Sequence, residues 1–316
     1  MTKATVYFAT PRRLPKPDRL AGRVVVLDLA FAGIGRSFAK TTGRFIEALG
    51  ARLAVWVDHH DHKMHEVFAA DARFVLSDKA QHPGCAELVT EDLVREIGPV
   101  ETILVHNDLD GLYCAAKWLG GGREPYAGAD ADARAVDSRI GDVGPTALMV
   151  DRALRARPKD EALRHRILAF LADGRSQDRG VVQEAAAEFD RLEERARQLA
   201  KEYDVSPPVA YIEVDEGDRS FDKTTLLMEG QKRTEVSVVK QGPYVTVAAA
   251  FDSGWNFLDL LGLDGGMPTR VSVTEARLDE LMRKLHEGPS RSRRDRGSSG
   301  DQGAEHDRGS TAGGRT

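Results

Sequence analysis

The chain has 316 residues, which is long enough for two domains with separate cores. Its formal net charge of -5 predicts no strongly basic face, so tight nonspecific binding to long nucleic acid is not expected. Two cysteines, Cys85 and Cys114, are too few for a disulfide framework or a four-cysteine zinc site, and they suit a reducing compartment. We find neither a secretory signal nor an apolar stretch of the roughly 20 residues that span a membrane. We therefore predict a cytoplasmic protein without a membrane partner.

The first 180 residues alternate short apolar runs with helix-like segments. This alternation predicts an α/β domain over residues 1–180, in which a parallel sheet is covered by helices. The expected strands are Thr5–Phe8, Val24–Leu27, Leu53–Val57 and Thr102–Val105. The expected helices are Ser37–Leu49, Glu87–Ile97, Leu112–Leu119 and Arg164–Ala172.

The remainder of the chain predicts a linker helix, a smaller domain and a tail. Residues 181–205 are rich in Glu, Arg and Ala, as expected for a helix between domains. After two prolines, an α+β domain is predicted over residues 206–287. Its expected elements are the strands Val209–Val214, Glu235–Val239 and Tyr244–Ala249 and the helix Glu275–His286. Residues 288–316 contain no aromatic or branched apolar residue, so we predict that they form a disordered tail.

Acidic and histidine residues follow three of the predicted strands directly. These residues are Asp28, Asp58, His59, His60, His106, Asp108 and Asp110. In an open parallel sheet, ligands bind in the crevice beyond the carboxyl ends of the strands. Acids at the end of buried apolar runs are costly unless they are paired, and a divalent metal ion would pair with them. Imidazoles and carboxylates without thiolates suit manganese, iron or zinc better than calcium.

Each of these features also has a purely structural interpretation. Asp28 alone would be a turn or helix-capping residue, and the Asp-Leu-Asp-Gly segment lacks the Glu that an EF-hand loop carries at its twelfth position. His62 and His65 are expected at the surface. The coincidence of acids and histidines at three strand ends nevertheless favours a metal site.

The same residues carry a resemblance to a known family. Val57-Asp58-His59-His60 resembles the signature of the DHH phosphoesterase superfamily, and Pro83–Val89 resembles the small-residue helix start that follows it. Val26-Leu27-Asp28 resembles the strand that ends in a metal-bridging Asp. His106–Gly111 is similar to the first motif of the family, in the form seen in oligoribonuclease-like (nanoRNase-like) members.

The order of these motifs differs from that of the family. The first motif here follows the other two, so the chain resembles a circularly permuted member. Such an order is physically acceptable, because strands that are neighbours in a sheet need not be consecutive in sequence.

The resemblance implies a catalytic centre with two divalent ions, Mn²⁺ foremost, with Mg²⁺, Fe²⁺ or Zn²⁺ as alternatives. The implied ligands are His106 and Asp108 for one ion, His59 and Asp110 for the other, and Asp28 as the bridge. His60 would face the phosphate, and Asp58 would orient a histidine. For the last ligand we favour Asp173, which would otherwise simply end a helix before Gly174; Asp137 and Asp178 are weaker candidates.

A fainter resemblance concerns the second domain, in which the family often carries a glycine-rich, histidine-containing substrate loop. Gly265 and Gly266 would allow close backbone approach to a substrate. Met267 stands where the histidine would be expected, and Arg270 would grip a phosphate in its place. An ordinary turn between strands is the alternative.

The resemblance implies hydrolysis of a phosphodiester or phosphomonoester by water activated between two metal ions. The expected substrate is a short single-stranded oligonucleotide, a cyclic dinucleotide or a nucleoside bisphosphate. The alternatives are hydrolysis of pyrophosphate or polyphosphate, and a non-catalytic, metal-dependent nucleotide sensor. A homodimer is also left open.

Overall fold

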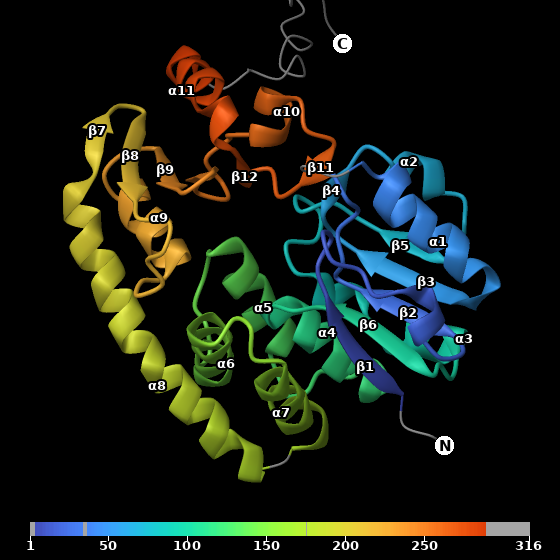
Figure 1. The fold of residues 1–316 in the computed structure, drawn as a ribbon. Helices are drawn as coiled ribbons and strands as arrows, with labels where there is room; N and C mark the ends of the chain where they lie inside the picture. The colour runs from blue at the N-terminus through green and yellow to red at the C-terminus, as the bar shows by residue number, and fades with distance from the viewer. Residues whose placement is uncertain (1–3, 34–36, 175, 289–316) are drawn as a thin grey trace, which may run out of the picture.

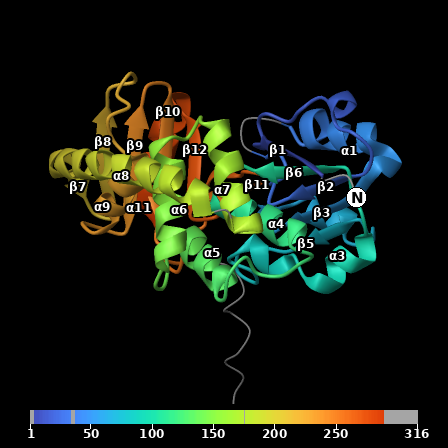
Figure 2. The same cartoon turned by 90° about the horizontal axis from the view of Figure 1, so that it is seen from below.

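The computed structural model describes residues 4–33, 37–174 and 176–288, and the predicted tail lies outside these ranges apart from Gly288. Within them, the chain forms a five-stranded parallel sheet flanked by helices and a separate mixed sheet with its own helices (Figures 1 and 2). The predicted fold class, an α/β domain followed by a smaller α+β domain, is therefore confirmed. No helix in the described ranges is both long and apolar enough to cross a membrane.

The first sheet places the three motif-bearing strands side by side. Its strands are, in spatial order, β1 (Thr5–Ala9), β6 (Thr102–His106), β2 (Val24–Leu27), β3 (Leu53–Asp58) and β5 (Phe74–Leu76). All neighbouring pairs are parallel, and Leu27 lies opposite both Val57 and Val105. Because β2 lies between β3 and β6, Asp28 emerges between the other two motifs. The four predicted strands are present, whereas β5 was too short to be recognised.

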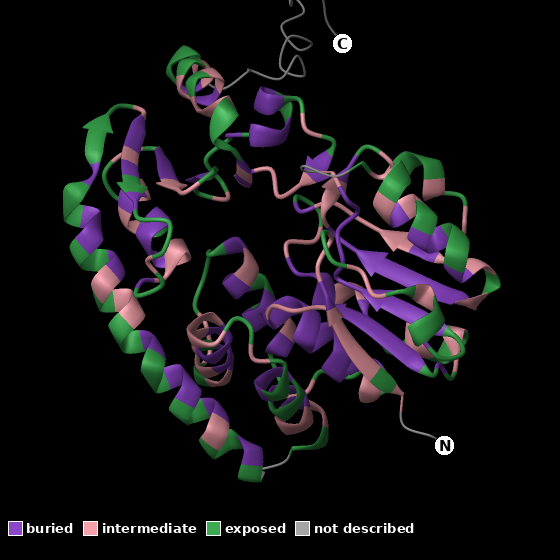
Figure 3. Ribbon diagram, viewed as in Figure 1, coloured by how far each residue is buried: buried purple, intermediate pink, exposed green. Residues whose placement is uncertain are grey.

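The central strands β2, β3 and β6 are buried, and Figure 3 colours them mostly purple, whereas β1 is mainly of intermediate burial. On one face, Val25, Val55 and Ile103 pack in a core shared with several helices. These helices are α3 (Glu91–Ile97), α4 (Leu109–Leu119), α5 (Ala129–Ser138), α6 (Pro145–Ala156) and α7 (Glu161–Asp173). The other face carries Trp56 and Leu104 under α1 (Arg44–Leu49) and α2 (His65–Phe68). Each fully buried Val or Leu contributes roughly 1.5–3 kcal/mol.

Capping residues explain where several helices differ from their predicted bounds. Thr90 accepts a hydrogen bond from the backbone N–H of Leu93, so α3 starts at Glu91 rather than at Glu87. Asp108 caps α4, which therefore begins three residues earlier than predicted. The predicted helix Ser37–Leu49 is helical from Ala39, as a π-helical segment (Ala39–Gly43) followed by α1. Helices α5 and α6 were not predicted.

A long helix, α8 (Ser176–Leu199), occupies most of the predicted linker and contacts both parts of the chain (Figure 1, yellow-green). It packs against α6 and α7 at one end and against α9 (Lys223–Gln231) at the other. The second sheet has the order β12 (Arg270–Thr274), β10 (Tyr244–Ala249), β9 (Val236–Gln241), β8 (Val209–Val214) and β7 (Asp204–Ser206). Helices α10 (Phe257–Leu261) and α11 (Leu278–Glu287) complete this part.

A short two-stranded ribbon joins the two parts directly beside the predicted site. Strand β11 (Gly265–Gly266) pairs antiparallel with β4 (Asp61–His62), the segment that follows His60. A Cβ atom on Gly265 would lie only 2.1 Å from Cδ2 of His62, and Gly266 has a φ of 135°. The backbone contact therefore requires glycine at both positions.

Candidate metal centre

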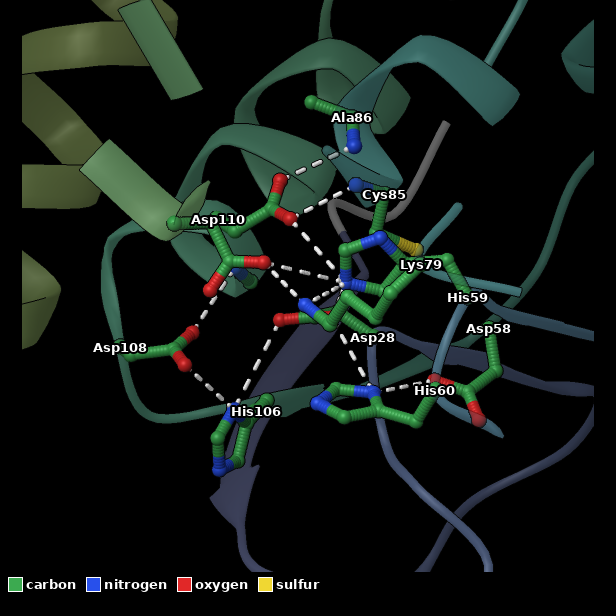
Figure 4. Close-up of polar contacts among 12 residues, drawn as sticks. Asp28, Asp58, His59, His60, Lys79, Cys85, Ala86, His106, Asp108 and Asp110 are labelled. Atoms are coloured by element: carbon green, nitrogen blue, oxygen red, sulfur yellow. Dashed lines mark hydrogen bonds and ion pairs between the residues drawn. The ribbon is translucent and has the colours of Figure 1, made fainter. Parts of the chain in front are cut away.

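The carboxyl ends of β2, β3 and β6 bring the predicted acids and histidines together (Figure 4). Asp28 lies at the centre, and its backbone has a φ of 54°, which is uncommon for a residue other than glycine. Its side chain is 1% exposed, and both carboxylate oxygens are buried without a hydrogen-bond partner among the described residues. Unpaired buried carboxylates of this kind are costly and call for an explanation.

One group of metal-competent side chains consists of Asp28, His106 and Asp108. Nδ1 of His106 lies 2.7 Å from Oδ2 of Asp108 and 3.6 Å from Oδ2 of Asp28. This Nδ1 atom, like the oxygens of Asp28, is buried without a hydrogen bond in the described structure. Burial alone would lower the pKa of His106, but Asp108 and Asp28 raise it well above its ordinary value. Within the described residues, the ion pairs of Asp28 and Asp108 are formed with histidines and not with a lysine or arginine.

A second group consists of His59, Asp110 and Asp137. Nε2 of His59 lies 3.3 Å from Oδ1 of Asp28, 3.4 Å from Oδ2 of Asp110 and 3.6 Å from Oδ2 of Asp137. Nδ1 of His59 lies 2.7 Å from the carbonyl oxygen of His82 and donates to it, which leaves Nε2 facing the carboxylates.

Backbone donors hold Asp110 in this second group. The N–H groups of Cys85 and Ala86 donate to its two oxygens at 2.6 and 3.0 Å. Burial and the neighbouring carboxylate of Asp28 raise the pKa of Asp110 to about 8. A cation among these carboxylates would reverse this shift, because it favours the ionised form.

Asp58 and His60 form a buried pair beside these groups. Nδ1 of His60 donates to Oδ1 of Asp58 at 2.8 Å, and Asp58 is completely buried. Burial, together with Lys79 and His59, lowers the pKa of His60 well below its ordinary value. His60 is therefore neutral and presents Nε2 with its lone pair. The hydrogen bond to Asp58 fixes the orientation of the His60 ring.

Sequence reasoning missed Lys79, which lies in the segment after β5. Its side chain is 3% exposed, and its ammonium contacts Nε2 of His59 at 2.7 Å and forms an ion pair with Asp137. Burial alone would lower its pKa, but the carboxylates of Asp137, Asp28 and Asp110 raise it above the ordinary lysine value. No sequence pattern marks this lysine, because its position depends entirely on how the segment folds back over β3.

The structure places Asp137, rather than Asp173, among the metal-competent side chains. Asp137 lies in the last turn of α5 and belongs to the second group. Asp173 is exposed at the end of α7, and Asp178 lies in α8 with its carboxylate 3.4 Å from Arg166. Neither belongs to a metal-competent group in the described ranges. Asp137, the weaker candidate from the sequence, therefore lies with the other acids, and the helix that carries it was not recognised in the sequence.

Two histidines near the motif also differ in burial from expectation. His62 was expected at the surface but is 9% exposed and packs against the rings of Phe31 and Phe38. His65 is partly buried, and its Nε2 lies 3.8 Å from Oδ2 of Asp58. Both belong to the packing behind the site.

A cavity of about 1180 Å³ opens between the site and the second domain. The site contributes His60, Lys79, Asp108 and Asp137 to its lining. Across from them lie residues of the second domain: Lys223, Thr224, Tyr244, Phe251, Met267 and Arg270.

Arg270 is the predicted substrate residue that lines this cavity. Its Nη1 donates to Oγ1 of Thr224 at 3.1 Å. Burial and the nearby Arg139 lower the pKa of Arg270 to about 10, which an anionic ligand would reverse. Gly265 and Gly266, by contrast, are used in the pairing of β11 with β4.

The side chains of the first group fit a divalent ion. The observation that decides this is the buried carboxylate of Asp28, whose two oxygens accept no hydrogen bond from the described residues and lie 3.3 Å from Nε2 of His59 and 3.6 Å from Nδ1 of His106. Carboxylate and imidazole donors match the ligand preferences of manganese, iron and zinc.

No family model matches the chain, and no curated protein sequence matches it. Several solved structures are similar to it. One of them is the pGpG-specific phosphodiesterase PggH from Vibrio cholerae, at 12% identity and a TM-score of 0.43, with 73% of this chain and 77% of that chain covered. Another is exonuclease RecJ bound to manganese, at 14% identity and a TM-score of 0.46, with 86% of this chain and 76% of that chain covered.

Proposed function

We propose that the chain is a metal-dependent phosphoesterase that hydrolyses a phosphate ester of a small nucleotide. The observation that carries this proposal is Asp28, a buried carboxylate whose oxygens accept no hydrogen bond from the described residues and which belongs to two of the three metal-competent groups. This site lies in the wall of a cavity that the half-buried Arg270 also lines. A divalent ion bound there would lower the pKa of water and offset the charge of a phosphoryl group.

The chain's own residues hold this centre in place before any ligand arrives. Asp28, His106 and Asp108 would hold an ion, with the carbonyl of His82 orienting His59 and the backbone donors orienting Asp110. Such outer contacts fix the direction of ligand atoms. His60, held in one tautomer by Asp58, would face the phosphate from the side of β3. Arg270 would bind a phosphate oxygen and position the substrate.

The walls of the cavity favour a nucleotide over a bare phosphate compound. Its volume of about 1180 Å³ is slightly above the range for small-molecule sites, roughly 300–1,000 Å³. Tyr244 is 49% exposed, and Phe251 and Met267 add apolar surface on which a base would pack. Pyrophosphate would leave this surface unused. A short oligonucleotide, a cyclic dinucleotide or a nucleoside bisphosphate would use both the charged and the apolar walls.

The proposal is tested by hydrolysis assays with manganese and with EDTA. The probes are bis-p-nitrophenyl phosphate as a generic diester, the linear dinucleotide pGpG, which is the substrate named for one similar structure, and pyrophosphate. We expect manganese-dependent hydrolysis of the diester and the dinucleotide, and little hydrolysis of pyrophosphate. A folded wild-type protein that hydrolyses none of them would overturn the proposal.

A matched pair of variants tests the assignment of the last acid. Asp137→Asn should lower the rate at least about tenfold, because an acid of the centre loses its charge, equivalent to about 1.4 kcal/mol or more. Asp173→Asn removes the same charge from the end of α7 and should leave the rate unchanged. The opposite pattern, with Asp173→Asn inactive and Asp137→Asn active, would restore the assignment favoured by the sequence.

A further inference from the structure

Three groups of side chains in the described residues could hold a metal ion, and two of them, that of Asp28, His106 and Asp108 and that of His59, Asp110 and Asp137, share no residue. These two groups differ in whether a lysine ammonium already lies among their side chains. In the group of Asp28, His106 and Asp108, both oxygens of Asp28 and Nδ1 of His106 are buried without a hydrogen bond among the described residues. In the group of His59, Asp110 and Asp137, each side chain has a partner. The ammonium of Lys79 contacts His59 and Asp137, and backbone N–H groups satisfy Asp110.

The position of Lys79 is that of a cation among ligands. Its Nζ atom lies 2.7 Å from Nε2 of His59, the same nitrogen that faces oxygens of Asp110 and Asp137 at 3.4 and 3.6 Å. Nδ1 of His59 contacts the carbonyl oxygen of His82, so Nε2 is the ring nitrogen that faces the acids of this group. With the ammonium of Lys79 2.7 Å away, the position beside Nε2 that a metal ion would need is already filled.

Charge opposes adding an ion to this group while Lys79 stays in place. An ammonium and a divalent ion that share ligands would repel each other strongly in a buried site, where the effective dielectric constant is low. Lys79 is 3% exposed, and two of the ligands hold it directly. In the group of Asp28, His106 and Asp108, the ion pairs among the described residues are formed with histidines alone.

We propose that the ammonium of Lys79 takes the place of a second divalent ion, so that the chain binds one ion, at Asp28, His106 and Asp108. This inference rests on the proposed function and changes its metal content from two ions to one. The fixed ammonium would neutralise part of the charge of Asp137 and Asp110, and it lines the cavity beside His60.

The number of bound ions tests this inference without any activity assay. Metal-free wild-type protein is dialysed to equilibrium against Mn²⁺ well above its dissociation constant, and bound manganese per chain is measured by elemental analysis. We expect one ion for the wild type. Lys79→Ala opens the second group and should bind two. Lys117→Ala is the matched control, because Lys117 is equally buried but pairs with Asp130 outside the site; it should bind one.

Two ions bound to the wild-type chain would overturn the inference and leave the proposed function intact. A folded Lys79→Ala protein that still binds one ion would also overturn it. If Lys79→Ala does not fold, Lys79→Gln keeps a hydrogen-bond donor without the charge and is measured instead, with the same expectation of two ions. A wild-type chain that binds no ion would contradict the metal centre itself, and with it the inference.

Discussion

Two buried charge clusters line the same cavity, and they differ in how fully their charges are paired. In one, the guanidinium of Arg155 donates to Asp151 at 2.8 Å and to Thr225 at 2.9 Å, forms an ion pair with Asp222, and packs over the ring of Phe189. In the other, Asp28 has no hydrogen-bond partner among the described residues. Buried charges that are paired suit a structural contact, whereas a buried charge left unpaired suits a ligand site.

The position of the paired cluster supports this contrast. Arg155 and Asp151 belong to α6, and Asp222 caps α9 of the second domain. The cluster therefore holds the two sides of the cavity together. The cluster around Asp28 lies at the strand ends and faces the space that the other cluster helps to enclose. The cluster of Arg155 is thus expected to contribute to stability, and the cluster around Asp28 to metal binding and catalysis.

The largest expected effect comes from Asp28→Asn. Hydrolysis should fall by roughly a thousandfold, about 4 kcal/mol, because the carboxylate that would hold the ion is lost. The metal-free variant should be at least as stable as the metal-free wild type, because an unpaired buried charge is removed. Rates and urea unfolding in EDTA measure both effects. A variant that is active but much less stable would make Asp28 a structural residue.

The opposite pattern is expected for Asp222→Asn. Removing one partner of a buried ion pair costs about 3 kcal/mol, because Arg155 then loses part of its compensation. Asn still caps α9, so the change isolates the charge. Urea unfolding at pH 7 should show the loss, while manganese binding stays unchanged. Loss of manganese binding with unchanged stability would instead show that Asp222 belongs to the metal site.

The same variant makes a prediction about pH. Burial alone would raise the pKa of Asp222, but Arg155 holds it below its ordinary value in the folded protein. Such a group adds stability above its unfolded pKa of about 3.9 and loses it as the pH falls through the folded value. The stability difference between wild type and Asp222→Asn should therefore have its full size between about pH 5 and 7, because these values lie above the unfolded pKa of about 3.9. The difference should shrink below about pH 4. A difference that does not change with pH would exclude the charge as its cause.

A smaller effect is expected for Arg270→Met. Loss of the guanidinium should raise KM for a nucleotide about ten- to hundredfold, roughly 1.4–2.7 kcal/mol, with a smaller change in kcat, because Arg270 lies across the cavity from the metal-competent side chains. Arg283→Met, on the exposed face of α11, is the control. Steady-state kinetics separate the two constants. An unchanged KM would remove Arg270 from substrate binding.

The strand ends were predictable from the sequence because the apolar runs and the acids that follow them are local features. The pattern around Asp28, Asp58 and His106 predicted a parallel sheet, which the structure has, and a metal site at its strand ends. The order of the motifs along the chain did not obscure this pattern, because β2 lies between β3 and β6 in the sheet.

Other parts of the site depend on tertiary contacts that no local pattern encodes. Asp137 sits in α5, whose aspartates weaken the helical signal. Lys79 reaches His59 only because its segment folds over β3. Gly265 was predicted to contact the substrate, whereas in the structure it pairs with β4. The sequence does not reveal this pairing, because it joins segments about 200 residues apart.

The most direct test of the account is the effect of manganese on the melting temperature of wild-type protein and Asp28→Asn, each first stripped with EDTA. Manganese at about 100 times its dissociation constant should stabilise the wild type by about 2.7 kcal/mol, a rise of several degrees, and should leave Asp28→Asn unchanged. An equal rise in both proteins, or none in the wild type, would contradict a metal centre built around Asp28.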